Sequence, residues 1–317
     1  MAKQRKYEIS LRDTGLAFGV TGCAPDANLA NPNVTNTSSL PGIAFSAGPA
    51  RTLTNVQLHL IFWGAWWNAN PFALEVSGAV TRLLAGPYMT YLAQYGLGRA
   101  NIHGTTFASD SEPGFFSFGS VGSFIKNLLT GSRVPEPDDQ WPMVYAVIMP
   151  TNASFQGAQP YDKKVPVPAG TVSGILGENG KVTWVDFNDP SGVEFLPAYF
   201  FWVGNNGTDV AGLDYITTVL SHELVELATD PNGADGIRRL GPPQLGGQPV
   251  GYQIGDVCQN WCDYVRGVKA QSYWSQLDGN CVLPKVYSVR RTLYGKSIGG
   301  KIPRPMPSAN AWITSQF

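Results

Sequence analysis

Charged side chains are scarce in this sequence. Asp, Glu, Lys and Arg make up 14% of the 317 residues, whereas about 25% is typical of soluble proteins. The 22 basic and 23 acidic residues nearly cancel, so the chain lacks the positive surplus expected of a nucleic-acid-binding protein. With 43% hydrophobic residues and a formal net charge of -1, the sequence also excludes disorder as the main state. Gly, Pro and neutral polar residues fill the deficit, a composition that favours a protein working outside the cytosol.

Long apolar runs are also absent. The longest stretches, such as residues 58–63 and 199–203, fall far short of the ~20 residues that a membrane-spanning helix needs. The basic N-terminus, residues 1–7, is not followed by the apolar core of a secretory signal. We therefore expect no membrane span, and an extracellular or cell-envelope location would require either a removed signal or an unconventional export route.

Strand-like and helix-like segments alternate along the middle of the chain. Short β-prone apolar runs predict strands, and apolar spacing of three to four residues with Pro or Gly at the boundaries predicts helices. The expected strands are 56–63, 101–107, 143–149, 182–187 and 198–203, and the expected helices are 70–84, 121–129 and 209–230. This order predicts an α/β or α+β fold with a mixed sheet and flanking helices.

Composition divides the chain into three parts. Residues 1–50 are rich in Pro, Asn, Ser and Gly and predict an extended arm. Residues 51–284 form the expected single α/β domain, of which 252–284 reads as a loop-rich cap tied by a disulfide. Residues 285–317 form a basic tail without an acidic residue, which either folds back onto an acidic surface or is solvated.

Histidine is rare, with three residues in the chain, and one of them lies in the most informative segment. Residues 219–231 read Val-Leu-Ser-His-Glu-Leu-Val-Glu-Leu-Ala-Thr-Asp-Pro. On a helix of about 100° per residue, Glu226 lies about 40° from His222, Asp230 about 80° and Glu223 about 100°. The leucines gather on the opposite side. His222 and Glu226, at i and i+4, can therefore reach one ion together, in the manner of an H-E-x-x-H zinc helix whose middle Glu is the general base.

The charges around this helix strengthen the interpretation. No Lys or Arg occurs between Lys181 and Arg238, although solvated acidic helix faces usually carry basic residues at i,i+4. The same stretch holds nine carboxylates: Asp186, Asp189, Glu194, Asp209, Asp214, Glu223, Glu226, Asp230 and Asp235. They repel one another unless they are spread out or neutralised by a cation. We therefore favour a metal site over two alternatives, a spread solvated acidic surface and a metal-free acid/base pair.

The other two histidines are weaker candidates. His59 alternates within an expected buried strand and is interpreted as a core residue, and His103 lies at a strand edge where a surface role is favoured. Any further ligand of His222 and Glu226 is therefore expected to be a carboxylate.

The four cysteines predict disulfides. Cys258 and Cys262 have no second Cys or His pair that would complete a zinc site. A Cys258–Cys281 bond would close a loop worth roughly 3 kcal/mol in the chain-entropy account. Cys23–Cys262 could then attach the N-terminal arm to the cap, although the sequence alone leaves all three pairings open.

The motifs together resemble a known family. The chain resembles a group of bacterial proteins related to the plant phosphate-induced (Exordium-like) proteins. The segments that carry this resemblance are Ser221–Pro231, Ile254–Cys258 and Gln271–Val282, with 56–64 and 86–89. The resemblance covers roughly residues 54–283. It implies a secreted or cell-wall protein whose helix is similar to that of a zincin-type metallopeptidase.

One position departs from the family pattern. The family's second motif places a Glu, a natural third zinc ligand, where this chain has Gln253. Since an amide is a poor zinc ligand, Asp256 or Asp230 is expected to take that place. We also expect Gln253→Glu to tighten zinc binding.

Two functions follow as hypotheses. The first is a zinc-dependent hydrolase, most simply a metallopeptidase acting on a peptide or protein, with Glu223 as general base. The second is a non-catalytic extracellular protein with a structural cation, in which aromatic residues such as Trp66 and Trp67 bind carbohydrate or a protein partner.

Overall fold

A computed structural model describes residues 52–138, 141–155, 177–186, 194–232, 236–240, 249–258 and 261–285, together with strands β1 (Ile9–Ser10) and β2 (Val34–Asn36). Cys23, most of the expected arm 1–50 and the tail 286–317 lie outside the described residues.

A mixed sheet forms the centre of the described domain. Its strand order is β1, β8 (Gly177–Asp186), β9 (Glu194–Val203), β6 (Met143–Ile148), β3 (Asn55–Trp63), β4 (Arg99–Ala108). Strands β4, β3, β6 and β9 are mutually parallel, and β8 pairs antiparallel with β9 and with β1. The predicted α/β class with a mixed sheet is therefore confirmed.

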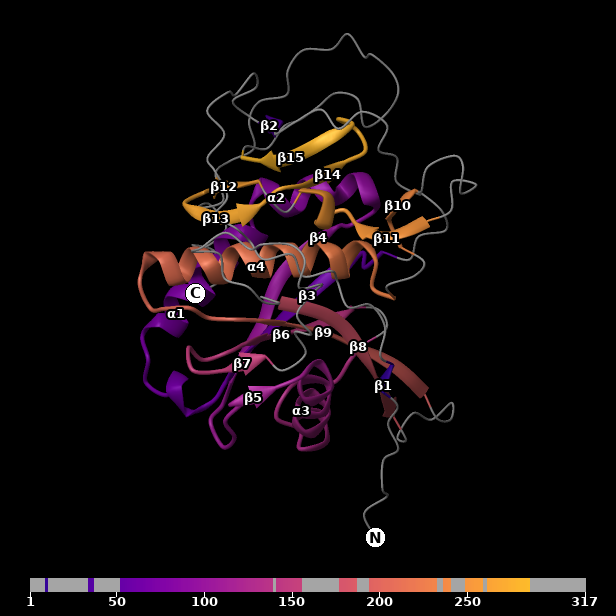
Figure 1. The fold of residues 1–317 in the computed structure, drawn as a ribbon. Helices are drawn as coiled ribbons and strands as arrows, with labels where there is room; N and C mark the ends of the chain where they lie inside the picture. The colour runs from indigo at the N-terminus through magenta and orange to yellow at the C-terminus, as the bar shows by residue number, and fades with distance from the viewer. Residues whose placement is uncertain are drawn as a thin grey trace, which may run out of the picture. The chain divides into compact units, whose positions relative to one another are not determined.

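Helices cover both faces of this sheet. Alternate residues of β3 divide between two cores: Leu58, Leu60 and Phe62 pack with α1 (Phe72–Leu84) and α4 (Val210–Thr229), whereas Ile61 and Trp63 pack with α3 (Phe118–Thr130). Figure 1 shows α4 above the sheet and α3 below it. Every residue of β6 is buried, which agrees with its central place between two helical layers.

Short elements complete the domain, and several connect the major strands. They are η1 (Ala65–Trp67), α2 (Pro87–Thr90), η2 (Tyr91–Tyr95) and the small strands β5 (Phe115–Phe116) and β7 (Ser154–Phe155). Each helix and strand predicted for 56–230 has its counterpart in the structure, with ends displaced by a few residues.

The segment expected to be a loop-rich cap is more regular than predicted. It contains β11 (Pro249–Gln253), η4 (Asp256–Cys258), β12 (Cys262–Val265), β13 (Val268–Gln271), β14 (Tyr273–Ser275) and β15 (Asn280–Pro284). Strands β12–β13 and β14–β15 form antiparallel pairs, β2 adds to β15, and β11 pairs with β10 (Arg238–Leu240). The strands are only three to five residues long, so their alternation is too brief to stand out in the sequence.

The cap determines the environment of α4. This helix contacts β8 and β9 on the sheet side and β13 on the cap side, an arrangement visible in Figure 1. Most of its residues are consequently buried, including Glu223 and Glu226. The alternative of a solvated acidic surface is therefore wrong for the polar side of this helix.

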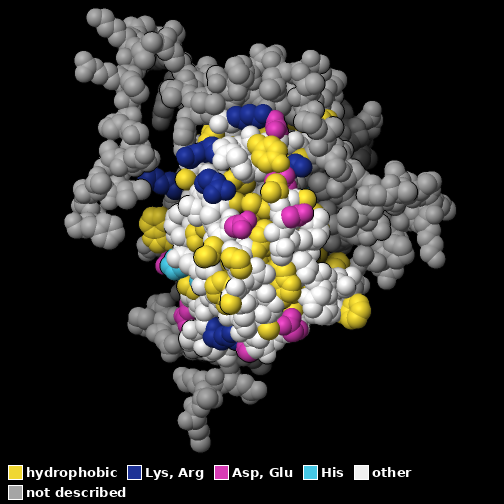
Figure 2. All heavy atoms as spheres, turned by 90° about the vertical axis from the view of Figure 1, so that its left-hand side faces the viewer, with side chains coloured by type: hydrophobic (Ala, Val, Ile, Leu, Met, Phe, Trp, Pro, Cys, Tyr) yellow, Lys and Arg dark blue, Asp and Glu magenta, His cyan; other side chains and the backbone are white. Residues whose placement is uncertain are grey.

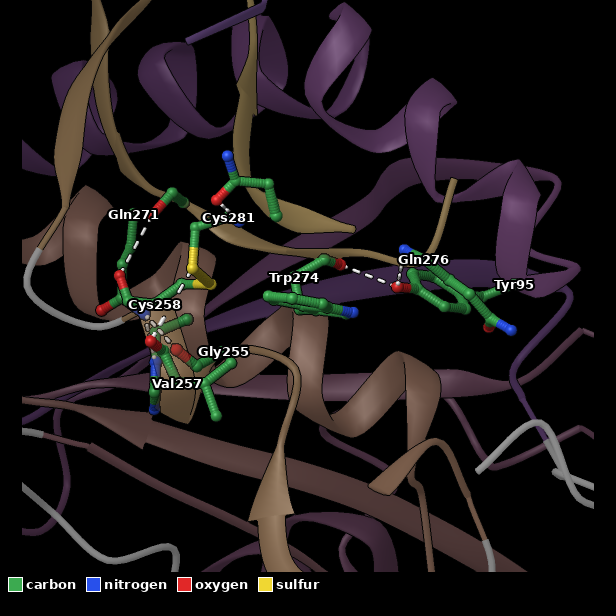
Figure 3. Close-up of a disulfide and its surroundings, with 11 residues drawn as sticks. Tyr95, Gly255, Val257, Cys258, Gln271, Trp274, Gln276 and Cys281 are labelled. Atoms are coloured by element: carbon green, nitrogen blue, oxygen red, sulfur yellow. Dashed lines mark hydrogen bonds between the residues drawn. A yellow bond between two sulfur atoms is a disulfide. The ribbon is translucent and has the colours of Figure 1, made fainter. Parts of the chain in front are cut away.

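A disulfide fixes the cap internally. Cys258 in η4 is bonded to Cys281 in β15 (Figure 3), as predicted. Cys262 is disulfide-bonded as well, but its predicted partner Cys23 lies outside the described residues.

The surface agrees with the low charge of the sequence. On the face shown in Figure 2, charged side chains of both signs are few and lie among neutral and apolar ones. None of the helices in the described part of the chain combines the length and the apolar content needed to cross a bilayer.

Candidate metal-binding site

Helix α4 carries both predicted ligands, His222 and Glu226. Its first turn is capped by Asp209, whose side chain accepts a hydrogen bond from the backbone N–H of Gly212. The helix then runs without interruption to Thr229, so His222 and Glu226 lie one turn apart on the same side. The distance between His222 Nε2 and Glu226 Oε1 is 3.3 Å.

Asp256 joins this pair from the cap. Its Oδ1 lies 4.0 Å from His222 Nε2, and one ligand atom of each of the three residues lies within 4.8 Å of the other two. Asp256 Oδ2 accepts a hydrogen bond from the backbone N–H of Gln253, which orients the carboxylate at the start of η4. Of the two acidic candidates for a third ligand, Asp256 is the one that the fold brings to the pair.

Glu226 is the most strongly buried member of the cluster. Its side chain is 0% exposed, and Oε1 has no hydrogen-bond partner among the described residues. Oε2 accepts a long hydrogen bond of 3.3 Å from the Asn179 amide. Burial, followed by the nearby Asp256 and Glu223, raises the pKa of Glu226 well above its usual value. A buried carboxylate of this kind needs either a proton or a cation.

His222 is held from behind by Gln271. The Gln271 amide nitrogen lies 2.7 Å from His222 Nδ1, so the ring directs Nε2 toward Glu226. Burial lowers the pKa of His222 to about 4. The ring is therefore neutral at pH 7, which is the form that binds metals.

Two glycines allow the surrounding chain to approach this closely. A Cβ on Gly255 would lie 2.8 Å from Glu226 Oε1 and 3.0 Å from His222 Nδ1. A Cβ on Gly177 in β8 would lie 2.7 Å from Glu223 Oε1. Because real Cβ atoms do not come so near, a side chain at either position would displace the cluster.

Glu223 lies beside the cluster and outside the three-ligand group. Its Oε2 accepts a hydrogen bond of 2.9 Å from Asn179, the same amide that contacts Glu226. The side chain is turned toward β8 and is 5% exposed. This position is compatible with the predicted role of Glu223, which requires it to be near the ligands without being one of them.

Asp230 is not part of the group, contrary to one of the alternatives from the sequence. Its Oδ1 accepts from the backbone N–H of Gly236 and its Oδ2 from the Gln253 amide. The carboxylate thus organises the chain where α4 ends. The Gln253 side chain points to Asp230 as well, so a Glu at this position would meet a like charge, and the expectation that Gln253→Glu tightens zinc binding loses its basis.

The remaining candidates lie elsewhere. His59 is buried, with Nε2 2.8 Å from Thr106 Oγ1, as expected of a core residue. His103 is exposed on β4. Trp67 is fully buried and Trp66 packs against the core, so this pair does not form the exposed aromatic platform considered for carbohydrate.

Sequence reasoning missed the amides that support the cluster. Asn179 and Gln271 are 44 and 49 residues from their partners on α4. Neither amide belongs to a short motif. No local sequence pattern indicates that a residue on a distant strand will contact the cluster. The resembling segment Gln271–Val282 included one of them, but without a role.

Comparisons with known proteins add no assignment, because no family model, no curated protein and no solved structure is significantly similar to this chain.

Proposed function

We propose that His222, Glu226 and Asp256 bind a zinc ion and that the protein is a zinc-dependent hydrolase. The observation that carries this proposal is the convergence of one imidazole nitrogen and two carboxylate oxygens within 4.8 Å, with Glu226 Oε1 fully buried and without a hydrogen-bond partner among the described residues. A cation at this point would neutralise a charge that the interior otherwise disfavours.

The donor set fits zinc. Bonds of about 2.0–2.2 Å place two tetrahedral ligand atoms about 3.3–3.6 Å apart, and the 3.3 Å between His222 Nε2 and Glu226 Oε1 has this length. The 4.0 Å between His222 and Asp256 is longer, and a small rotation of the Asp256 side chain would close it. Three protein ligands leave one position of a tetrahedral ion for another molecule, which is typical of catalytic sites.

Glu223 is the residue proposed for proton transfer. Zinc held by the three ligands would supply a Lewis acid that activates water for attack on a carbonyl. Glu223 would accept the proton of that water and pass it to the leaving group. The Asn179 amide holds the Glu223 and Glu226 carboxylates together, and the partly exposed His222, 15% accessible, marks the side from which substrate would approach.

The substrate class and location follow as further proposals. A peptide or protein substrate is proposed from the similarity of the helix to that of zincin-type metallopeptidases. Secretion is supported by the Cys258–Cys281 disulfide, since such bonds persist in oxidising compartments. The relationship to the Exordium-like proteins rests on the sequence motifs and stays a prediction.

A structural metal is the second candidate function. It is favoured by the burial of the carboxylates: Asp256 is 5% and Glu226 0% exposed. In this alternative the ion would join α4 to η4 and stabilise the cap, and the protein would act by binding a partner.

One experiment separates the two candidates. Glu223→Gln is compared with wild type for zinc affinity by calorimetry and for cleavage of a peptide library, with the exposed Glu75→Gln as control. A hydrolase predicts that Glu223→Gln keeps zinc and loses turnover by roughly 10²–10⁴-fold. Stoichiometric zinc without turnover in any sample would support the structural site, and loss of zinc in Glu223→Gln would show that Glu223 is a ligand.

A further inference from the structure

The contact between Gln271 and His222 indicates which nitrogen of the His222 ring carries the hydrogen. The Gln271 Nε2 atom lies 2.7 Å from His222 Nδ1 and 3.1 Å from the backbone oxygen of Gly255. A backbone carbonyl only accepts hydrogen bonds. The Gln271 atom at this point is therefore the nitrogen, because an amide oxygen would be repelled by the Gly255 oxygen.

The Gln271 side chain has little freedom to turn round. Gln271 is 1% exposed, and Figure 3 shows it with Gly255 beside the Cys258–Cys281 disulfide. Its backbone N–H donates to Ser221 Oγ at 2.9 Å, and its backbone oxygen accepts from the Tyr88 hydroxyl at 2.8 Å. Both partners are buried, so the residue is fixed to α4 next to His222.

The protonation of the ring follows from this arrangement. With two hydrogens, the Gln271 amide nitrogen can donate both to Gly255 and to Nδ1. A neutral imidazole that accepts at Nδ1 carries its hydrogen on Nε2. Nε2 faces Glu226 Oε1 at 3.3 Å, so the hydrogen occupies the direction in which a metal would bind.

We infer that Gln271 is a positioning residue that sets the tautomer of His222 and thereby opposes metal binding at Nε2. Zinc uptake requires Nε2 to release its hydrogen and Nδ1 to gain one, which leaves the proton count of the ring unchanged. Metal-binding histidines usually have an acceptor in front of the Nδ1–H that results. Gln271 can supply one only by turning its oxygen toward His222 and losing the bond to Gly255. The tautomer assignment stands without the proposed metal site, whereas its effect on metal binding rests on that site.

The first test needs no metal. The chain contains three histidines, so long-range ¹H–¹⁵N spectra of ¹⁵N-histidine-labelled, metal-free protein at pH 7 resolve each ring. His222 is expected to carry its hydrogen on Nε2 in wild type and in the control Gln276→Leu, whose side chain is exposed. In Gln271→Glu, which places an acceptor before Nδ1, the hydrogen is expected on Nδ1. Finding the Nδ1–H form in the wild type would overturn the inference, and this result does not depend on any variant folding.

The second test uses zinc titration of the same proteins. Gln271→Glu is expected to tighten zinc binding about 10-fold or more, within the 10–100-fold range of outer-shell partners, whereas Gln271→Leu is expected not to do so. A merely structural Gln271 predicts that both variants weaken binding together, and that result would refute the inference. Failure of zinc to bind any of these proteins would instead count against the proposed function, while the tautomer measurement would still decide the role of Gln271.

Discussion

Replacing Glu226 by Gln should change stability in opposite directions with and without zinc. The Glu226 carboxylate is 0% exposed, and burial raises its pKa. In the metal-free protein the folded state therefore binds a proton at Glu226 more tightly than the unfolded state does, and the free energy of unfolding falls as pH rises above about 4.5. Glu226→Gln removes this penalty, because the amide is neutral at every pH in this range.

The size of the effect has an upper bound. Each pH unit over which only the folded state is protonated costs about 1.4 kcal/mol, so the loss between pH 4.5 and 7 is at most about 3.5 kcal/mol. In EDTA at pH 7, Glu226→Gln should be more stable than wild type by up to this amount, and the difference should vanish near pH 4.5. At a zinc concentration 100 times the dissociation constant, wild type should gain about 2.7 kcal/mol, and the variant, which lacks a ligand, should gain far less.

Urea unfolding at pH 4.5, 6 and 7, in EDTA and in zinc, measures both effects. Glu75→Gln on the exposed side of α1 is the matched control and should follow wild type throughout. Equal zinc stabilisation of wild type and Glu226→Gln, or a variant that is less stable than wild type in EDTA at pH 7, would refute the reasoning.

Three further predictions test other parts of the account. Asp256→Asn should weaken zinc binding by about 10-fold or more. Asp230→Asn should leave the affinity for zinc within about threefold, because Asp230 binds Gly236 and Gln253. Calorimetric titration of both variants measures this difference, and equal effects would contradict the prediction. Burial, with a smaller contribution from His103, lowers the pKa of His59 to about 4, so the unfolded state binds an extra proton between about pH 6.5 and 4 and stability falls as pH drops through this range. Discounted for partial solvent screening, His59 contributes about 1–2 kcal/mol of this loss. Urea unfolding should show a fall that is smaller by this amount in His59→Gln, which keeps the contribution of His222. Replacing Cys258 and Cys281 by Ser should lower the free energy of unfolding by about 3 kcal/mol, and an unchanged urea midpoint would show that the bond does not stabilise the fold.

Local patterns predicted the helices and strands of the domain, as α4 illustrates. Its caps, its leucine spacing and the i,i+4 relation of His222 and Glu226 are properties of neighbouring residues, so the sequence contains them directly. The short strands of the cap were missed because three to five residues give too little alternation to distinguish strand from loop.

The site was only partly predictable because several of its residues come from parts of the chain far from α4. Asp256 and Asp230 were equivalent candidates in the sequence, and only the path of the chain from β11 into η4 brings Asp256 to His222. The burial of Glu223 and Glu226 depends on β8 and β13 packing on opposite sides of α4. Local charge indicated that the carboxylates needed compensation, but not that a buried amide from each neighbouring strand would reach them.

Metal analysis of the purified protein tests the central claim most directly. Wild type and the control His103→Ala, which changes an exposed histidine on β4, are dialysed against zinc and then against metal-free buffer beside His222→Ala. The account predicts one zinc ion per chain in wild type and in His103→Ala, and none in His222→Ala. Absence of zinc from wild type, or its retention in His222→Ala, would contradict it.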